Sequence, residues 1–183
     1  MLLSMSVAGT LHVLWLKSNM AGRFFQPVDF GLTFRNRRLF GENKRLCGFM
    51  VLPPATAATF VLLYAVAQAL FPAIAEALWA LSTVQQAGLG FAFGLAFMAA
   101  ELPNSFIKRQ LDIAPGETSK QPRLRTIIML VDRFDSVLGV LLVASLLVHI
   151  SVATWMLVLI AGPAIHALFS IAMYAIGIKV RAL

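Results

Sequence analysis

The sequence predicts an all-α integral membrane protein with about five transmembrane helices. Of its 183 residues, 60% are hydrophobic and only 13% are charged, whereas a soluble domain carries about 25% charged residues. The mean hydropathy is +0.83. The apolar residues form runs near the length of about 20 residues that crosses a bilayer. A chain of this length is expected to form one polytopic membrane domain over residues 1–183.

Five apolar runs are the expected spans, and one charged loop follows the first span and another follows the third. The first run is short, so the sequence leaves open whether it is a full span. The apolar stretch 71–86 contains Glu76, and it is either an interfacial helix or the beginning of a long tilted helix. The predicted spans are 1–16, 48–70, 87–107, 127–150 and 152–178, with cytoplasmic loops 17–47 and 108–126.

The basic residues predict the orientation of the chain. All 15 Lys and Arg residues fall within 17–45, 108–133 and 179–181, which lie on one side of a five-span protein. Because positive residues are retained in the cytoplasm, we expect the N-terminus outside and the C-terminus inside. This clustering, with attraction to anionic lipid head groups, accounts for the net charge of +7 without a nucleic-acid partner.

Cysteine and histidine give little indication of a metal centre. The single Cys47 excludes an intramolecular disulfide and a multi-cysteine zinc site. His12, His149 and His166 are far apart and lie in apolar runs. We interpret the three histidines as packing or interfacial residues.

The first polar cluster of interest ends the run 87–107. Glu101, Ser105 and Lys108 are spaced by four and three residues, which places them on one face of a helix. A carboxylate, a hydroxyl and an ammonium group on one face suit a metal-bound phosphate. Alternatively, the helix leaves the membrane here and Lys108 and Arg109 extend to the interface.

The second polar cluster is Asp132, Arg133 and Asp135, at the mouth of the run 127–150. An ionised side chain inside a bilayer costs at least about 2.5–3.5 kcal/mol, and two carboxylates on one helix face repel unless a cation lies between them. Ligands that are all oxygen favour Mg²⁺. The alternative is a charge network that joins two helices, for instance between Asp132 and Lys108.

Two further patterns are less specific. Gly90 and Gly94, with Ala92, Ala96 and Ala100, repeat small residues at a spacing of four, which favours close helix packing in lipid. The tetrapeptide from Gly41 to Lys44 lies in a cytoplasmic loop and could contact a phosphate or a nucleotide.

In this order, the motifs resemble those of the CTP-dependent cytidylyltransferases of lipid synthesis. The matching segments are Phe40-Gly-Glu-Asn-Lys44, Glu101-Leu-Pro-Asn-Ser-Phe-Ile-Lys-Arg109 and Asp132-Arg-Phe-Asp-Ser-Val-Leu-Gly139. The chain looks most like the short, five-helix CDP-archaeol synthase branch, and it is similar to the C-terminal half of phosphatidate cytidylyltransferases. The likeness covers residues 38–139.

The resemblance implies that a lipid phosphate reacts with CTP to give a CDP-lipid and pyrophosphate at the cytoplasmic face of a prokaryotic inner membrane. Its implied partners are CTP, a membrane lipid phosphate and the bilayer, and its implied cofactor is Mg²⁺. The implied catalytic residues are Lys108, Arg109, Asp132 and Asp135, the substrate-binding residues are Asn43, Lys44, Ser105 and Arg133, and the metal ligands are Glu101, Asp132 and Asp135.

The sequence departs from the family pattern at two places. Glu101 stands where the family usually has Asp, and Arg45-Leu-Cys-Gly48 replaces the usual Thr-Trp-Arg-Gly. Two alternatives therefore stay open beside the enzyme: a catalytically impaired relative that binds lipid or a partner, and a small ion-transporter subunit. The lipid tail and the oligomeric state do not follow from the sequence.

Overall fold

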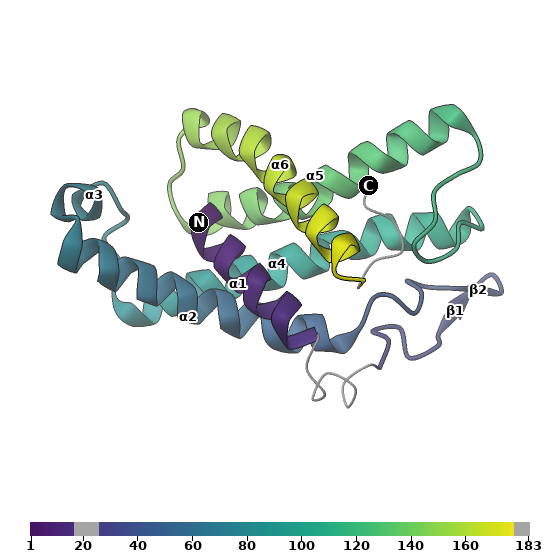
Figure 1. Ribbon diagram of the computed structural model, residues 1–183, viewed down its shortest axis with the longest axis horizontal. Helices are drawn as coiled ribbons and strands as arrows, with labels where there is room; N and C mark the ends of the chain where they lie inside the picture. Colours follow the sequence, from purple (N-terminus) through teal and green to yellow (C-terminus); the bar gives the residue numbers. More distant parts are fainter. Residues whose placement is uncertain (17–25, 178–183) are drawn as a thin grey trace.

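A computed structural model describes residues 1–16 and 26–177, and in these ranges the protein is mostly helical (Figure 1). Lys17, Arg23, Lys179 and Arg181, which helped to predict the orientation, lie outside the described residues. The elements are α1 (Leu2–Leu16), β1 (Thr33–Phe34), β2 (Arg37–Arg38), α2 (Leu46–Leu70), α3 (Pro72–Glu76), α4 (Thr83–Gln110), α5 (Pro122–Leu147) and α6 (Val152–Ala175).

Each predicted span coincides with a long helix, with shifted ends. Within the described residues, α2, α4 and α6 are long and apolar enough to cross a membrane, and α1 is a shorter apolar helix. Helix α5 is 26 residues long but carries Asp132, Arg133 and Asp135 near its middle. The chain thus has three helices that could cross a membrane, as expected of an integral membrane protein, while the count of five and the orientation of the termini stay predictions.

The stretch between α2 and α4 forms a short helix of its own. Helix α3 follows α2 directly, and α4 then begins at Thr83 with a capping box in which Ser82 and Gln85 bond each other's backbone. Side-chain caps of this kind define where a helix begins. The alternative of a long tilted helix that begins in residues 71–86 is therefore wrong, because the residues between α3 and α4 are not helical.

The prediction of an all-α fold needs one small correction, a β-hairpin in the loop before α2. Thr33 pairs with Arg38 and Phe34 with Arg37. The two turn residues, Arg35 and Asn36, have φ of 52° and 60°, as in the tight turns that match strand twist. The hairpin depends on its turn residues and consists largely of charged and polar residues. A hydropathy pattern does not detect such an element.

Helices α2 and α4 approach closely at the predicted glycines. A Cβ added at Gly90 would lie 2.8 Å from the Thr56 carbonyl oxygen, and one at Gly94 would lie 2.6 Å from Pro53 Cα. Neither distance is available to a real side chain. The packing role predicted for Gly90 and Gly94 is thereby confirmed.

Helix α5 packs on another side of α4 through a third glycine. A Cβ at Gly139 would overlap the Ala100 side chain and lie 3.1 Å from the Ala96 carbonyl oxygen. A core of Phe60, Tyr64, Leu89, Phe93, Val140 and Ala144 joins α2, α4 and α5. These three helices form the inner layer that carries the polar residues.

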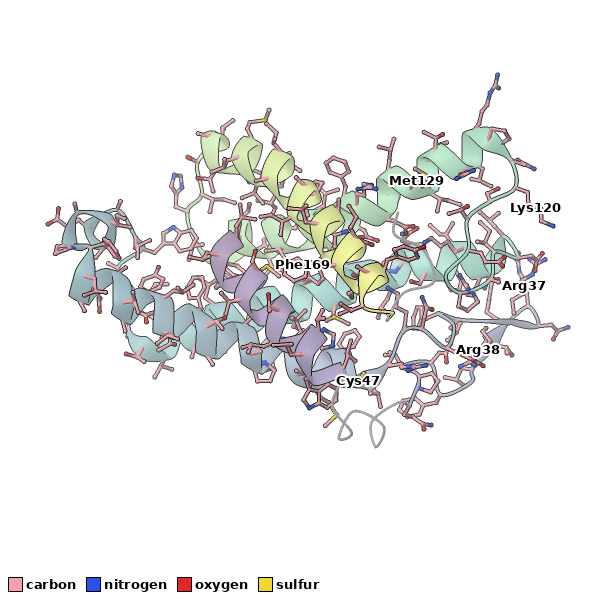
Figure 2. All side chains as sticks on the ribbon, viewed as in Figure 1. Arg37, Arg38, Cys47, Lys120, Met129 and Phe169 are labelled. Carbon is pink, nitrogen blue, oxygen red and sulfur yellow. The ribbon has the colours of Figure 1, made fainter. Side chains whose placement is uncertain are left out.

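Helices α1 and α6 form an outer layer and cross in front of α4 and α5 (Figure 1). Helix α1 packs mainly on α2, and α6 mainly on α5. The two meet where a Cβ at Gly9 would lie 3.5 Å from the Phe169 ring, which is labelled in Figure 2. A cavity lies between the two layers.

Candidate functional site

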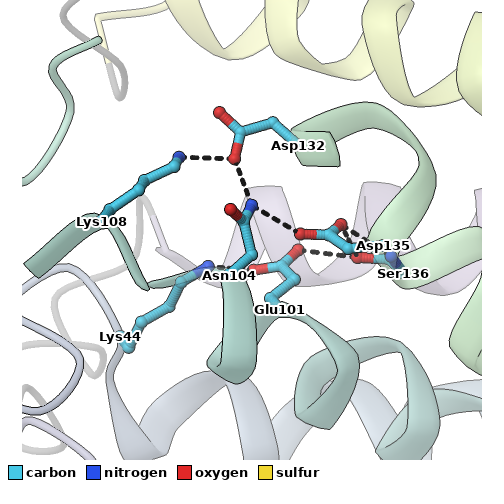
Figure 3. Close-up of polar contacts among 7 residues, drawn as sticks. All are labelled: Lys44, Glu101, Asn104, Lys108, Asp132, Asp135 and Ser136. Carbon is cyan, nitrogen blue, oxygen red and sulfur yellow. Dashed lines mark hydrogen bonds and ion pairs between the residues drawn. The ribbon is translucent and has the colours of Figure 1, made fainter. Parts of the chain in front are cut away.

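Seven polar residues from three parts of the chain form one connected cluster (Figure 3). Lys44 comes from the loop before α2, three residues come from the last third of α4, and three from the middle of α5. The full set is Lys44, Glu101, Asn104, Lys108, Asp132, Asp135 and Ser136. The structure therefore brings together residues that the sequence placed in three separate motifs.

The amide of Asn104 holds the two aspartates of α5. Its Nδ2 donates to Asp132 Oδ1 at 2.5 Å and to Asp135 Oδ2 at 3.0 Å. The two carboxylate oxygens thus flank one nitrogen atom, as the spacing of three predicted. Lys108 also donates to Asp132 and forms an ion pair with it. This is the helix-joining contact considered as the alternative for Asp132.

Glu101 connects the loop to both helices of the site. It forms an ion pair with Lys44, and Ser136 donates its hydroxyl proton to Glu101 Oε1 at 3.1 Å. The side chains of Lys44 and Glu101 are 16% and 19% exposed, so this pair is largely shielded from water. The opposite charge of Glu101 thus holds Lys44, a loop residue, against helix α4.

The donor set of the two aspartates fits Mg²⁺. Both carboxylates face the Asn104 amide, so their oxygen atoms lie close together. Mg²⁺ prefers oxygen ligands and keeps part of its shell for water or phosphate. Glu101 is instead paired with Lys44 and Ser136. The described residues contain no group of three or more His, Cys, Asp or Glu side chains that could hold a metal. A metal role for Glu101, Asp132 and Asp135 stays a prediction.

Arg109 is a buried cation beside the cluster. It is 8% exposed, and its Nε and Nη1 have no hydrogen-bond partner among the described residues. Gly41 lies against it: its φ is +93°, and an added Cβ would lie 3.2 Å from Arg109 Nη1. Glycine at the first position of the loop motif thus leaves room for this guanidinium, whose N–H groups are suited to a phosphate.

The remaining predicted site residues line the same cavity. Asn43, Ser105 and Arg133 face the space of about 730 Å³ between the two helix layers, together with the cluster and Arg109. The rest of its lining comes from α1, α2, α4, α5 and α6, whose lining residues are mostly apolar, and from the loop residues Arg45 and 115–118. The cavity therefore has one polar end and long apolar walls.

Sequence reasoning missed Asp29, which holds the loop in shape. This carboxylate is 1% exposed and accepts hydrogen bonds from the Arg38 side chain and from the backbone N–H groups of Phe40 and Gly41. It also accepts from Gly31 N at 3.1 Å, a local turn typical of Asp. The sequence signal for this turn was the position of Asp29 two residues before Gly31.

The charge of Asp29 is stabilised by these bonds. Burial by itself would raise its pKa, but the hydrogen bonds from Arg38 and from three backbone N–H groups lower the pKa to about 2. Asp29 is thus ionised at neutral pH, and it anchors Arg38, Phe40 and Gly41. The loop is further tied to the end of α4, because Arg37 donates to the Gln110 carbonyl oxygen and pairs with Asp112.

Comparisons with known proteins indicate the family of this chain. The sequence model of the CarS-like CDP-archaeol synthase family matches residues 17–181. A curated relative, the CDP-archaeol synthase of Thermofilum pendens (strain DSM 2475 / Hrk 5), is 29% identical over 155 residues. The match covers 84% of this chain but 64% of the relative's length. No solved structure matches the chain. The family match spans all three motifs and every residue of the polar cluster, and the chain belongs to the CDP-archaeol synthase family.

Proposed function

We propose that this protein is a CTP-dependent cytidylyltransferase that converts a membrane lipid phosphate into a CDP-lipid. The observation that carries the proposal is the shape of the cavity: a cluster of cations and carboxylates lies at one end of a space with apolar walls. An amphiphile with an anionic head fits such a space. The family and the Thermofilum relative are both named for CDP-archaeol, so an archaeol-type lipid phosphate is the first substrate to test.

The proposed reaction needs positioning and charge neutralisation. An oxygen of the lipid phosphate forms a bond to the α-phosphorus of CTP. The bond from that phosphorus to the bridging oxygen breaks, and pyrophosphate leaves with the electron pair. The protein does little covalent work in such transfers and acts by holding the reacting groups in line and stabilising their charge.

The cations of the site have distinct positions for this task. Lys44 comes from the loop before α2 and Lys108 from α4, and each is held by a carboxylate. Arg109 has buried N–H groups without a partner among the described residues. We assign these three residues, with Asn43, Ser105 and Arg133, to the phosphates of CTP and the lipid. A phosphate that enters can take over the cation from its carboxylate.

Asp132 and Asp135 are the residues that would hold Mg²⁺. When bound, the ion would neutralise phosphate charge and lower the barrier to attack at the α-phosphorus. Glu101 keeps Lys44 in the site and contacts Ser136 next to Asp135. Its longer side chain, where the family usually has Asp, reaches both partners from α4.

We further propose that the site faces the cytoplasm of a prokaryotic cell, in a protein with five spans and an external N-terminus. The loop that supplies Lys44 and the loop between α4 and α5 carry most of the basic residues, and they lie at the same end of the molecule (Figure 1). CTP is a cytoplasmic nucleotide, so this side also suits the substrate.

The test is turnover by the purified protein in detergent with CTP labelled at the α-phosphate. Archaeol phosphate and a diacyl phosphatidic acid are supplied in parallel, with and without Mg²⁺. We expect a labelled CDP-lipid, identified by mass spectrometry, and one pyrophosphate per product. Absence of product with both lipids would contradict the proposal and favour the non-catalytic relative or the transporter subunit.

A further inference from the structure

Helix α1 lines one wall of the cavity and carries a polar residue that the proposed reaction does not use. Its cavity-lining residues recur with helical spacing and are almost all apolar or small, for example Met5, Gly9 and Val13. The exceptions are Ser6 and His12. The Ser6 hydroxyl donates to the Leu2 carbonyl oxygen within the helix, which leaves the imidazole of His12 to be explained.

The His12 ring has a buried nitrogen without a partner. Its Nε2 is shielded from solvent and makes no hydrogen bond to the described residues. Among the described residues that line the cavity, only His12 and Arg109 have side-chain atoms of this kind. A buried polar atom without a partner is costly, so such an atom on a cavity wall indicates a ligand group.

His12 lies between the polar and apolar parts of the cavity. A Cβ added at Gly48 would lie 3.9 Å from His12 Cε1 and would overlap the end of Met98. Gly48 is four residues from Lys44, and Met98 is three residues from Glu101. The imidazole thus lies beside two residues that stand close in the sequence to Lys44 and Glu101, and all three side chains line the same cavity.

In a lipid phosphate, the group next to the phosphate is glycerol, and its other two oxygens link it to the chains. With the phosphate among Lys44, Lys108 and Arg109 and the chains along the apolar walls, these linking oxygens fall at the level of His12. An ether or ester oxygen is a hydrogen-bond acceptor. A neutral histidine with its proton on Nε2 is the matching donor.

We propose that His12 is a substrate-positioning residue that donates a hydrogen bond from Nε2 to a glycerol linking oxygen of the lipid. The inference rests on the proposed function, because it places the lipid head among the cations of the site. It assigns α1, which carries none of the family motifs quoted above, a direct part in lipid recognition.

The test compares His12→Phe, which removes the donor and keeps a ring, with His12→Gln, which keeps an amide donor. His149→Phe is the matched control, because that exposed loop residue contributes only its backbone carbonyl to a bond with Trp79. Two lipid probes are used: a dialkyl glycerol phosphate and hexadecyl phosphate, which has no glycerol.

We expect His12→Phe to raise the KM for the dialkyl glycerol phosphate about tenfold, the effect of one buried hydrogen bond. The KM for CTP and the affinity for hexadecyl phosphate stay within about twofold, and His12→Gln recovers most of the loss. An equal loss with both probes, or a loss confined to CTP, would overturn the assignment.

Direct binding keeps this test independent of turnover. The Kd of each variant for the dialkyl glycerol phosphate is measured by titration calorimetry in detergent without CTP. Weaker binding only in His12→Phe supports the inference even if no CDP-lipid forms, in which case the proposed function alone fails. Unchanged binding in His12→Phe refutes the inference even if wild-type turnover is normal.

Discussion

Asp132 and Asp135 share a single amide donor, yet their surroundings differ. Asp132 is 37% exposed and paired with Lys108, whereas Asp135 is half-buried and accepts from Ser136 N at 2.6 Å. We expect Asp132→Asn or Asp135→Asn to lower Mg²⁺-dependent turnover more than about 100-fold, with normal insertion and purification. Asp112→Asn, at an exposed ion pair with Arg37, is the control. Turnover near the wild-type rate in either variant refutes a shared metal role.

Glu101 acts through charge on one side and through a hydrogen bond on the other. Glu101→Gln can still accept from Ser136 but loses the ion pair with Lys44, whereas Glu101→Asp keeps the charge on a shorter side chain. We expect the Gln variant to lose more turnover than the Asp variant, by one to a few factors of ten, each about 1.4 kcal/mol. Turnover is measured against both Mg²⁺ and CTP concentration.

The two titrations separate the roles of Glu101. A changed Mg²⁺ dependence in Glu101→Gln indicates a metal ligand, and a raised KM for CTP with unchanged Mg²⁺ dependence indicates that Glu101 positions Lys44. If neither parameter changes, Glu101 has no part in the site and only supports the end of α4.

Asp29 makes the stability of the loop depend on pH. Its pKa is about 2 in the folded protein, below the ordinary value of 3.8. A lowered carboxylate pKa stabilises the fold above the ordinary pKa, and this contribution is lost as pH falls through the folded pKa. We expect Asp29→Asn to lower stability by about 1–3 kcal/mol at pH 7, and the difference from wild type to shrink as pH falls from about 4 toward 2.

Thermal unfolding in detergent at several pH values measures this effect, with Glu42→Gln as the control. Glu42 also pairs with Arg38 but is exposed. A difference between Asp29→Asn and wild type that stays constant down to pH 2 would show that the Asp29 charge does not hold the loop.

At the scale of elements, the closeness of α4 and α5 determines whether the cluster forms. Gly139 on α5 lies against Ala96 and Ala100, directly before Glu101. We expect Gly139→Val to force the helices apart, to destabilise the protein by about 1–3 kcal/mol and to reduce turnover, because Ser136 and Asp135 then move away from Glu101 and Asn104. Gly88→Val on α4 is the control, since nothing lies within 4 Å of its Cβ position. Equal stability and turnover in both variants would contradict this account.

The helices could be predicted from the sequence because long apolar runs and small-residue spacing act locally. The spacing of three also placed Asp132 and Asp135 together. The partners could not be predicted in the same way: Lys44 reaches Glu101 across 57 positions, and Asn104 was not among the predicted site residues although it holds both aspartates. Such pairings depend on how the loop before α2 and helix α5 lie against α4, which no local pattern encodes.

At the scale of the whole molecule, the orientation in the membrane is open to a direct test. Cys47 is only 3% exposed, so the native thiol is a poor reporter. In a Cys47→Ala background, we expect Lys120→Cys to react with an impermeant maleimide only in inverted vesicles, and Glu76→Cys only in intact cells. Both positions are exposed, and α3 lies at the opposite end of the molecule from Lys120 and the hairpin (Figure 2). The reverse pattern would place the polar cluster on the external side.

The pairing of the buried charges also bears on how the protein is made. Glu101, Asp132, Lys44 and Lys108 are all present once synthesis reaches α5, and in the structure each has an opposite charge as a partner. Helix α6, which completes the outer wall of the cavity, follows α5 in the chain and is synthesised after these four residues. Acids and lysines in the nascent chain can therefore neutralise each other during insertion, when an isolated charge would be expelled from the bilayer. We therefore expect the two ion pairs to lower the cost of inserting these side chains into the bilayer, in addition to any part they have in substrate binding.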